Sequence, residues 1–191
     1  MYALTSVGIF LVSILFGFLI FSLWLRIAIR YFRISTISPM GRIIYAVTQP
    51  LIQPLSLILH RLDKPGKRYD WIAIILLIAI ELIKIITLCA LMYHAIMPLP
   101  FIGLYVLADL IIQPCDILFF AILILIIMSY ANPRWEHPVK DFLLIITTPV
   151  LRQARKILPN TSVFDWATLV VLILLKAISI FISASLPWKL L

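Results

Sequence analysis

The chain has 191 residues, of which 64% are hydrophobic and 13% are charged, and its mean hydropathy is +1.15. Soluble domains are about half apolar and about a quarter charged, so this composition excludes a soluble globular domain and indicates an integral membrane protein. The net charge of +8 does not indicate nucleic-acid binding, because the basic residues flank hydrophobic segments and form no separate basic domain. Anionic lipid headgroups beside the loops are the simpler partners.

Four hydrophobic segments are long enough to cross a bilayer, which takes roughly 20 apolar residues. In chain order they cover about residues 7–29, 71–93, 101–130 and 166–186. As a single helix the third would be about 45 Å long, at about 1.5 Å per residue. We therefore expect Pro114 to divide it, with residues 116–130 crossing and residues 101–113 tilted, kinked or shallow at the outer interface. A five-span arrangement is the weaker alternative.

Basic residues predict the orientation of the spans. They are concentrated in the connections 30–70 and 131–165, whereas the connection 94–100 has none. By the positive-inside rule, both long connections lie in the cytoplasm and both termini lie outside. No cleavable signal peptide is visible, because residues 1–6 carry no Lys or Arg, so we expect the first span to be retained.

One segment of the sequence occurs twice, at a constant offset of 99 residues. SPMGRIIYAVTQPLIQPLSLIL in the first half aligns with HPVKDFLLIITTPVLRQARKIL in the second. After a four-residue difference in length, an aspartate precedes an apolar span in both halves. The matching positions are Thr48, Pro50 and Asp70 in the first copy and Thr147, Pro149 and Asp165 in the second.

The polar positions of the two copies also agree, since they follow the same steps of seven, four and three residues. They are Arg42, Gln49, Gln53 and Ser56 in the first copy and Asp141, Thr148, Arg152 and Arg155 in the second. This spacing places them on one face of a helix, with Ile, Leu and Val on the other. We therefore predict amphipathic helices over about residues 39–60 and 138–157, lying in the cytoplasmic interface and bent or broken at Pro50 and Pro149. The polar face either only contacts solvent or docks a partner.

The chain thus divides into two repeats, residues 1–95 and 96–191, each made of a span, an interfacial helix and a second span. Because the connection 94–100 is short, both repeats enter the membrane with the same polarity. They are parallel repeats, unlike the inverted repeats of many transporters. The predicted fold class is all-α transmembrane, with four spanning helices in two parallel repeats.

The two copies end in TQPLIQPL and TTPVLRQARKILP, and each is followed by Asp and an apolar helix. In this they resemble the YggT family of small bacterial inner-membrane proteins, which has plastid YlmG-like relatives. The resemblance covers nearly the whole chain. The second copy matches the family's basic pattern at Arg152, Arg155 and Lys156, whereas in the first copy the basic residues lie further toward the C-terminus. It implies a bacterial inner-membrane location. It also implies loose links to the assembly or distribution of other membrane components and to tolerance of osmotic stress, but no defined biochemical activity.

Ionisable residues within spans are costly and are functional candidates by default. Glu81 and Lys84 lie about 15–20 Å into the second span, at about 1.5 Å per residue. Lys176 lies at the depth of Glu81 in the other repeat, and Asp116 lies slightly beyond the midplane. We expect Glu81 to pair with Lys84 or Lys176, Asp116 to pair with the remaining lysine, and Asp109 to lie near the outer interface, where a charge costs little. The network either forms an ion or proton path or fixes helix register, and the scarcity of Ser and Thr favours the second.

Sequence motifs for catalysis and cofactor binding are absent, since there is no GxGxxG, P-loop, GxSxG or HExxH. Cys89 and Cys115 form no CxxC pair, and the three histidines form no metal-ligand pattern. We therefore expect a protein that is not an enzyme and that has no cofactor or metal.

Two hypotheses for function remain. The first is a membrane scaffold or assembly factor that binds anionic lipid, a membrane-protein partner or a second copy of itself. Its surface would comprise Arg42, Arg61, Lys140, Arg152, Arg155 and Lys156. The second is a small channel or transporter-like protein in ion homeostasis. Its polar network would comprise Glu81, Lys84, Asp116 and Lys176.

Overall fold

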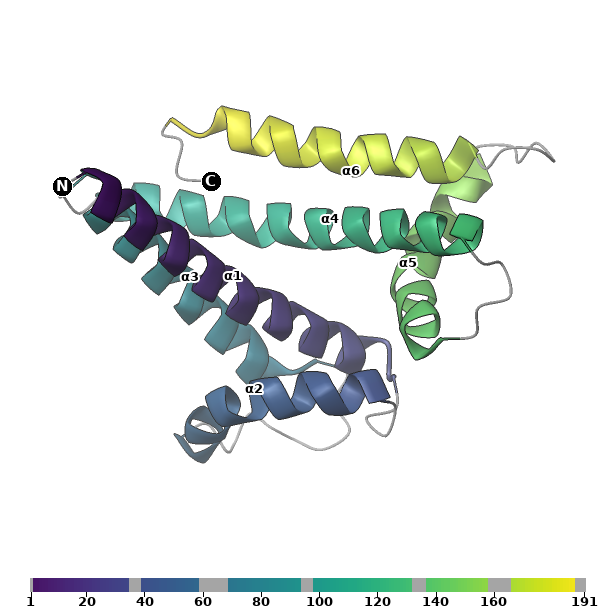
Figure 1. The fold of residues 1–191 in the computed structure, drawn as a ribbon, viewed down its shortest axis with the longest axis horizontal. Coiled ribbons are helices and arrows are strands. Elements are labelled where there is room, and N and C mark those ends of the chain that lie inside the picture. The colour runs from purple at the N-terminus through teal and green to yellow at the C-terminus, as the bar shows by residue number, and fades with distance from the viewer. Residues whose placement is uncertain are drawn as a thin grey trace. The chain divides into compact units, whose positions relative to one another are not determined.

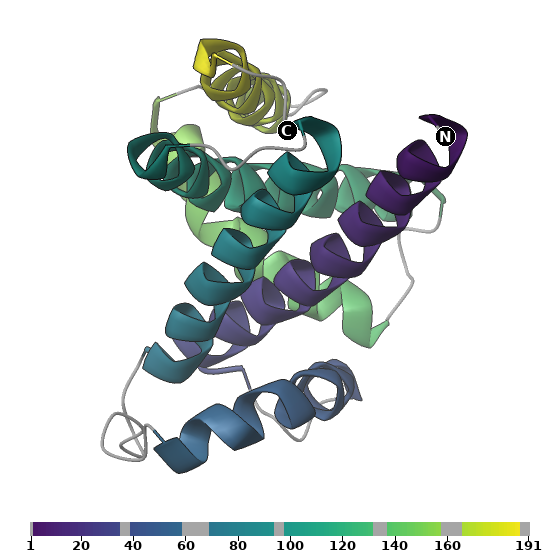
Figure 2. The ribbon, with the colours of Figure 1, turned by 90° about the vertical axis from the view of Figure 1, so that its left-hand side faces the viewer.

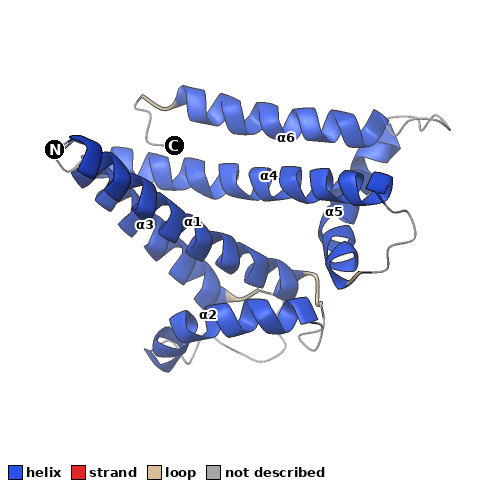
Figure 3. Ribbon diagram, viewed as in Figure 1, coloured by secondary structure: helices blue, strands red, loops and turns tan. Residues whose placement is uncertain are grey.

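The structure is a computed structural model that describes residues 2–34, 39–58, 69–93, 98–131, 137–157 and 166–187. These residues form six α-helices and no strand (Figures 1 and 3). In chain order the helices are α1 (Tyr2–Tyr31), α2 (Pro39–Ile58), α3 (Trp71–Tyr93), α4 (Leu99–Ala131), α5 (Pro138–Ile157) and α6 (Trp166–Ser185).

Four of these helices, α1, α3, α4 and α6, are long and apolar enough to cross a membrane. A helix is the form that an apolar chain takes there, because it satisfies every backbone N–H and C=O group within one segment. The all-helical fold with four candidate spans confirms the fold class expected from the sequence.

The third span, α4, runs without interruption from Leu99 to Ala131. The expectation that Pro114 divides this segment is therefore wrong. Proline removes one backbone donor, but a transmembrane helix tolerates this loss when neighbouring helices and local adjustments satisfy the freed carbonyl. Residues 101–113 consequently belong to the same helix as residues 116–130.

Helices also occupy the two segments that repeat in the sequence. The α2 helix continues through Pro50 and Pro54, and α5 continues through Pro149, so neither is broken at its proline. The ribbon of α2 changes direction along its length (Figure 2). Both helices bury apolar side chains on one side. The buried residues are Ile44 and Ile52 on α2 and Phe142, Ile146 and Leu151 on α5.

The chain packs as two compact units, one comprising Met1–Leu110 and Leu186–Leu191 and the other Ile111–Ser185. In the first unit, α1 packs along α3, and α2 contacts both (Figure 2). One core cluster joins these three helices through Leu23, Ile52 and Leu77. Another joins α3 to the start of α4 through Ile85 and Tyr105.

The second unit contains the rest of α4 together with α5 and α6. The α5 helix packs against α6. A core cluster formed by Ile122, Leu151, Val171 and Leu175 brings side chains of all three helices together. The helix α4 thus contributes to the core of both units, because the boundary between them falls within it.

Candidate functional site

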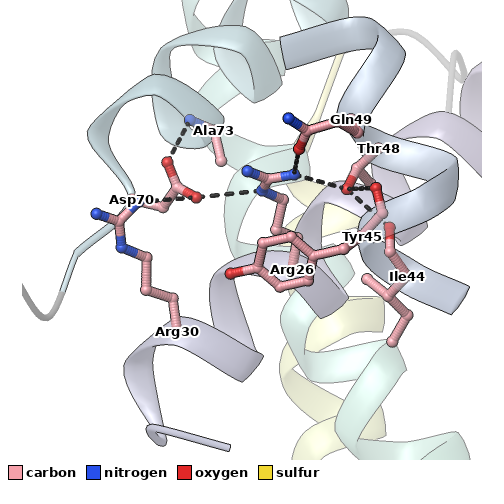
Figure 4. A network of polar contacts seen from close by, with 8 residues as sticks. All are labelled: Arg26, Arg30, Ile44, Tyr45, Thr48, Gln49, Asp70 and Ala73. Atoms are coloured by element: carbon pink, nitrogen blue, oxygen red, sulfur yellow. Dashed lines mark hydrogen bonds and ion pairs between the residues drawn. The ribbon is translucent and has the colours of Figure 1, made fainter. Parts of the chain in front are cut away.

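The most extensive polar network in the described part of the chain centres on Arg26 (Figure 4). This arginine lies near the end of α1, and its side chain is buried. Its Nε donates to Asp70 Oδ2 over 3.2 Å, and its Nη1 donates to Thr48 Oγ1 over 3.0 Å and to Gln49 Oε1 over 3.3 Å. One guanidinium group therefore connects α1 to α2 and to the start of α3.

Asp70 supports this network in two ways. Its Oδ1 accepts the backbone N–H of Ala73 over 3.2 Å, and its carbonyl accepts that of Ile74 over 3.0 Å, so it is the N-cap of α3. Its Oδ2 also lies 3.2 Å from Nη1 of Arg30, one turn after Arg26 on α1. The carboxylate thus begins one helix and forms ion pairs with two arginines of another, so this buried anion has a cation on each of two contacts.

Thr48 and its neighbours on α2 complete the network. The Thr48 hydroxyl donates to the carbonyl of Ile44 over 2.7 Å, which leaves its lone pairs directed at Arg26. The guanidinium carbon of Arg26 also lies 4.3 Å from the centroid of the Tyr45 ring, within the range of a cation–π contact. Thr48 and Asp70, two of the repeated positions, are therefore brought together by an arginine outside the repeated motif.

The second copy of the motif is held differently. Thr147 is also buried, and its hydroxyl donates to the carbonyl of Leu143 over 2.8 Å, within its own helix. The offset of 99 residues places Leu125 at the position of Arg26 and Ser129 at that of Arg30, so α4 carries no arginine there. Asp165, the match of Asp70, lies outside the described residues. Pro50 is exposed, and Pro149 is half-buried.

The ionisable residues within the spans form two separate groups. Lys84 on α3 contacts two carboxylates, Glu81 at 3.3 Å and Asp109 of α4. Lys176 on α6 donates to Asp116 of α4 over 3.1 Å, and its Nζ lies 5.7 Å from the Phe119 ring centroid. The Glu81–Lys84 and Asp116–Lys176 pairings are among those expected from the sequence, whereas the contact of Lys84 with Asp109 was not expected.

Asp109 corrects one expectation. The sequence placed it near the outer interface as a charge of small cost, whereas the structure buries it, with 3% of its surface exposed, against Lys84. The burial arises because Lys84 of α3 faces this part of α4, whereas the depth of Asp109 in the membrane stays a prediction.

The predicted basic surface is exposed where the structure describes it. Arg42 is exposed on α2, and Arg152, Arg155 and Lys156 are exposed at the end of α5, whereas Lys140 is half-buried. Arg61 lies outside the described residues.

The polar residues described above either connect helices through hydrogen bonds and ion pairs or present positive charge at the surface. Within the described ranges, no group of three or more His, Cys, Asp or Glu residues could hold a metal ion. Arg26, Asp70 and Thr48 engage one another, so the site holds together the last turns of α1, the middle of α2 and the start of α3. Its geometry offers no nucleophile beside a general base.

The comparison with protein families decides which family this is. The sequence profile of CCB3/YggT matches twice, over residues 5–91 and 104–186. The chain belongs to the CCB3/YggT family. The two matches show that the YggT domain is duplicated and that it covers most of the chain.

Two bacterial relatives support this assignment. The Escherichia coli K12 protein named Uncharacterized protein YggT is 26% identical over 172 residues, which cover 89% of this chain and 86% of that protein. The Pseudomonas aeruginosa protein named Uncharacterized protein PA0392 is 26% identical over 191 residues, which cover 97% of this chain and 93% of that protein. No solved structure matches the chain significantly. The YggT assignment thus establishes the family and leaves its function to be proposed.

Sequence reasoning missed the roles of Arg26 and Arg30 within the YggT repeat. Neither arginine was among the residues for which the sequence predicted a role. A signal was nevertheless present, because Arg26 falls inside an apolar span and not beyond it, and a charge at such a position needs a partner. The structure shows that the partners of Arg26 are the buried acceptors Thr48 and Asp70.

Proposed function

We propose that this YggT-family protein is a non-enzymatic membrane scaffold or assembly factor. In this proposal the basic faces of its two amphipathic helices hold anionic lipid headgroups or an acidic segment of a membrane-protein partner. The observation that carries the proposal is the exposure of Arg152, Arg155 and Lys156, three cations within five residues at the end of α5.

The arrangement of α5 suits a surface that contacts a charged partner. Its apolar side is buried through Phe142, Ile146 and Leu151, so the helix is anchored while its basic side remains exposed. Near an anionic membrane surface, each Lys or Arg contributes about 1 kcal/mol of attraction. The simpler explanation is that the cations only stabilise the negative end of the α5 helix dipole, worth about 0.3–1 kcal/mol each. Only the first explanation requires a partner.

The Arg26 network supports the same proposal from the other repeat. It fixes α2 to α1 and to the start of α3, so Arg42 is displayed on a helix of defined orientation. A scaffold benefits from such rigidity, because a preorganised surface loses little conformational entropy when it binds. The positive-inside rule would place both basic faces in the cytoplasm of a bacterial cell, at the inner membrane.

The test is affinity purification from native membranes in mild detergent. Wild type is compared with Arg152→Glu/Arg155→Glu/Lys156→Glu, and the matched control is Arg152→Lys/Arg155→Lys, which keeps the charge. We expect wild type and the lysine control to retain a stoichiometric partner or bound anionic lipid, and the glutamate variant to lose it while keeping its helix content. Equal retention by all three forms would refute the proposal.

A second candidate function is a small channel or transporter-like protein, favoured by the two groups of charges within the spans. The paired arrangement of these charges gives it less support, because Lys84 and Lys176 each already contact a carboxylate. Ion flux through liposomes tests it directly. A channel would lose its flux in Glu81→Gln/Lys176→Met, whereas a scaffold would show no flux in either form and would keep its partner.

A further inference from the structure

The second unit carries an ion pair that its own helices leave half-exposed. The side chains of Lys176 and Asp116 expose 44% and 32% of their surface, respectively. In the first unit, by contrast, the side chains of Glu81, Lys84 and Asp109 expose 0%, 14% and 4%. The helices of the first unit therefore cover their intramembrane charges far more completely than the helices of the second unit cover theirs.

The depth of the half-exposed pair makes this difference important. Lys176 lies ten residues into the 20-residue helix α6, which places it at the middle of a candidate span. Charged side chains at that depth face a bundle interior or a water-filled cavity, because facing lipid tails is costly. The neighbouring residues on the outer side of these two helices are apolar, since Phe120 and Ile180 are both exposed. The pair thus lies at the edge of an apolar face that needs a protein cover.

From this we infer that a second copy of the chain covers the Asp116–Lys176 pair, so that the protein forms a two-fold symmetric dimer through α4 and α6. Charge complementarity points to this occupant. Asp116 and Lys176 lie at one depth, because they are 3.1 Å apart. A two-fold axis along the membrane normal preserves depth and therefore allows the acid of each copy to lie beside the base of the other. Such an interface is isologous, the commonest kind among oligomers.

Small residues beside the pair allow two copies to approach closely. Ala177 and Ala184 are exposed and seven residues apart, so they lie on the same side of α6. Small side chains at such positions are typical of contacts between transmembrane helices. This interface lies within the membrane and does not depend on the basic cytoplasmic faces of the proposed function.

A charge-exchange experiment tests the dimer. Two differently tagged copies are co-expressed, extracted in mild detergent and captured through one tag. We expect Asp116→Lys paired with itself, and Lys176→Asp paired with itself, to co-purify about tenfold less than wild type, an effect of about 1.4 kcal/mol. Copies of Asp116→Lys co-expressed with copies of Lys176→Asp should recover the association, because one then presents two bases and the other two acids. Absence of recovery between well-folded copies would overturn the inference.

Disulfide crosslinking in cells tests the same face without changing its charges. In a Cys89→Ala/Cys115→Ala background, Ile180→Cys places a thiol one turn after Lys176 on the same side of α6. Ile178→Cys is the control, because Ile178 is also exposed and lies about 160° around α6 from both Lys176 and Ile180. We expect dimers to crosslink at residue 180 about tenfold more than at residue 178. Equal crosslinking at both positions, or none at either, would show that the pair is covered within a single chain or by another partner.

Discussion

The two repeats share a sequence motif but hold it by different contacts. In the first, Thr48 and Asp70 converge on Arg26 and tie three helices together. In the second, Leu125 stands at the position of that arginine, and the Thr147 hydroxyl bonds within its own helix. The shared residues therefore specify the local form of the helices α2 and α5. In the first repeat, an arginine outside the motif connects α2 to its neighbours.

The largest expected effect comes from making the first repeat resemble the second. Arg26→Leu removes the more deeply buried of the two cations beside Asp70, and with it the hydrogen bonds that join α1 to Thr48 and Gln49 of α2. We expect a loss of about 3–5 kcal/mol in the free energy of unfolding, as for other broken buried ion pairs. Reversible unfolding in mixed SDS and dodecyl maltoside micelles, followed by circular dichroism, measures it. Arg42→Leu removes an exposed arginine of α2 and should cost less than about 0.5 kcal/mol. Similar losses in both variants would contradict the role given to Arg26.

The charges within the spans extend the comparison. Lys84→Met leaves two buried carboxylates facing each other across α3 and α4, so we expect a loss of about 3 kcal/mol or more. Lys176→Met leaves a single, partly buried carboxylate, so we expect a smaller loss in the monomer than for Lys84→Met. The same unfolding assay, at a protein concentration too low for association, separates the two. Equal losses would mean that the two groups are covered equally well.

Two substitutions of Asp70 distinguish its role in the ion pairs from its role as the N-cap of α3. Asp70→Asn and Asp70→Ala both remove the charge that Arg26 and Arg30 contact, but only asparagine still accepts the N–H of Ala73. We therefore expect the alanine variant to be less stable than the asparagine variant by about 1 kcal/mol, the usual cost of a lost N-cap. Equal stability of the two variants would show that Asp70 acts only through its charge.

The smallest expected losses of stability come from substituting Thr48 and Thr147, the matching threonines of the two repeats. Thr48→Val removes an acceptor of Arg26 and should cost about 1 kcal/mol. Thr147→Val removes a hydroxyl that bonds to a carbonyl of its own helix, and should cost less than about 0.5 kcal/mol, because this carbonyl already accepts a backbone N–H. Thermal denaturation of the two variants, measured side by side, resolves the difference. A larger loss at Thr147 would reveal a contact in the second repeat that matches the arginine tie.

The parts of the structure that the sequence predicted are those governed by local chemistry. The spans follow from runs of apolar residues, and the interfacial helices follow from the spacing of residues such as Gln49 and Arg152. The family follows from the repeat around Thr48 and Thr147, and the comparison with CCB3/YggT confirms it.

The parts that the sequence left open depend on contacts distant along the chain. Arg26 bonds to Asp70, 44 residues away, and no local pattern selects that partner. The repeat did not reveal the tie either, because its second copy lacks the arginine. The continuity of α4 was missed because proline ends helices in water, whereas α4 continues through Pro114 among apolar neighbours.

The unbroken length of α4 has a consequence for the lipid around it. Its 33 residues extend to about 50 Å at about 1.5 Å per residue. The hydrocarbon layer of a bilayer is about 30 Å thick. This hydrophobic mismatch is relieved when the helix tilts, when its ends emerge into the headgroups or when the bilayer thickens nearby, each at a modest cost. The protein should therefore respond to bilayer thickness, and its tilt should decrease in membranes made of longer acyl chains.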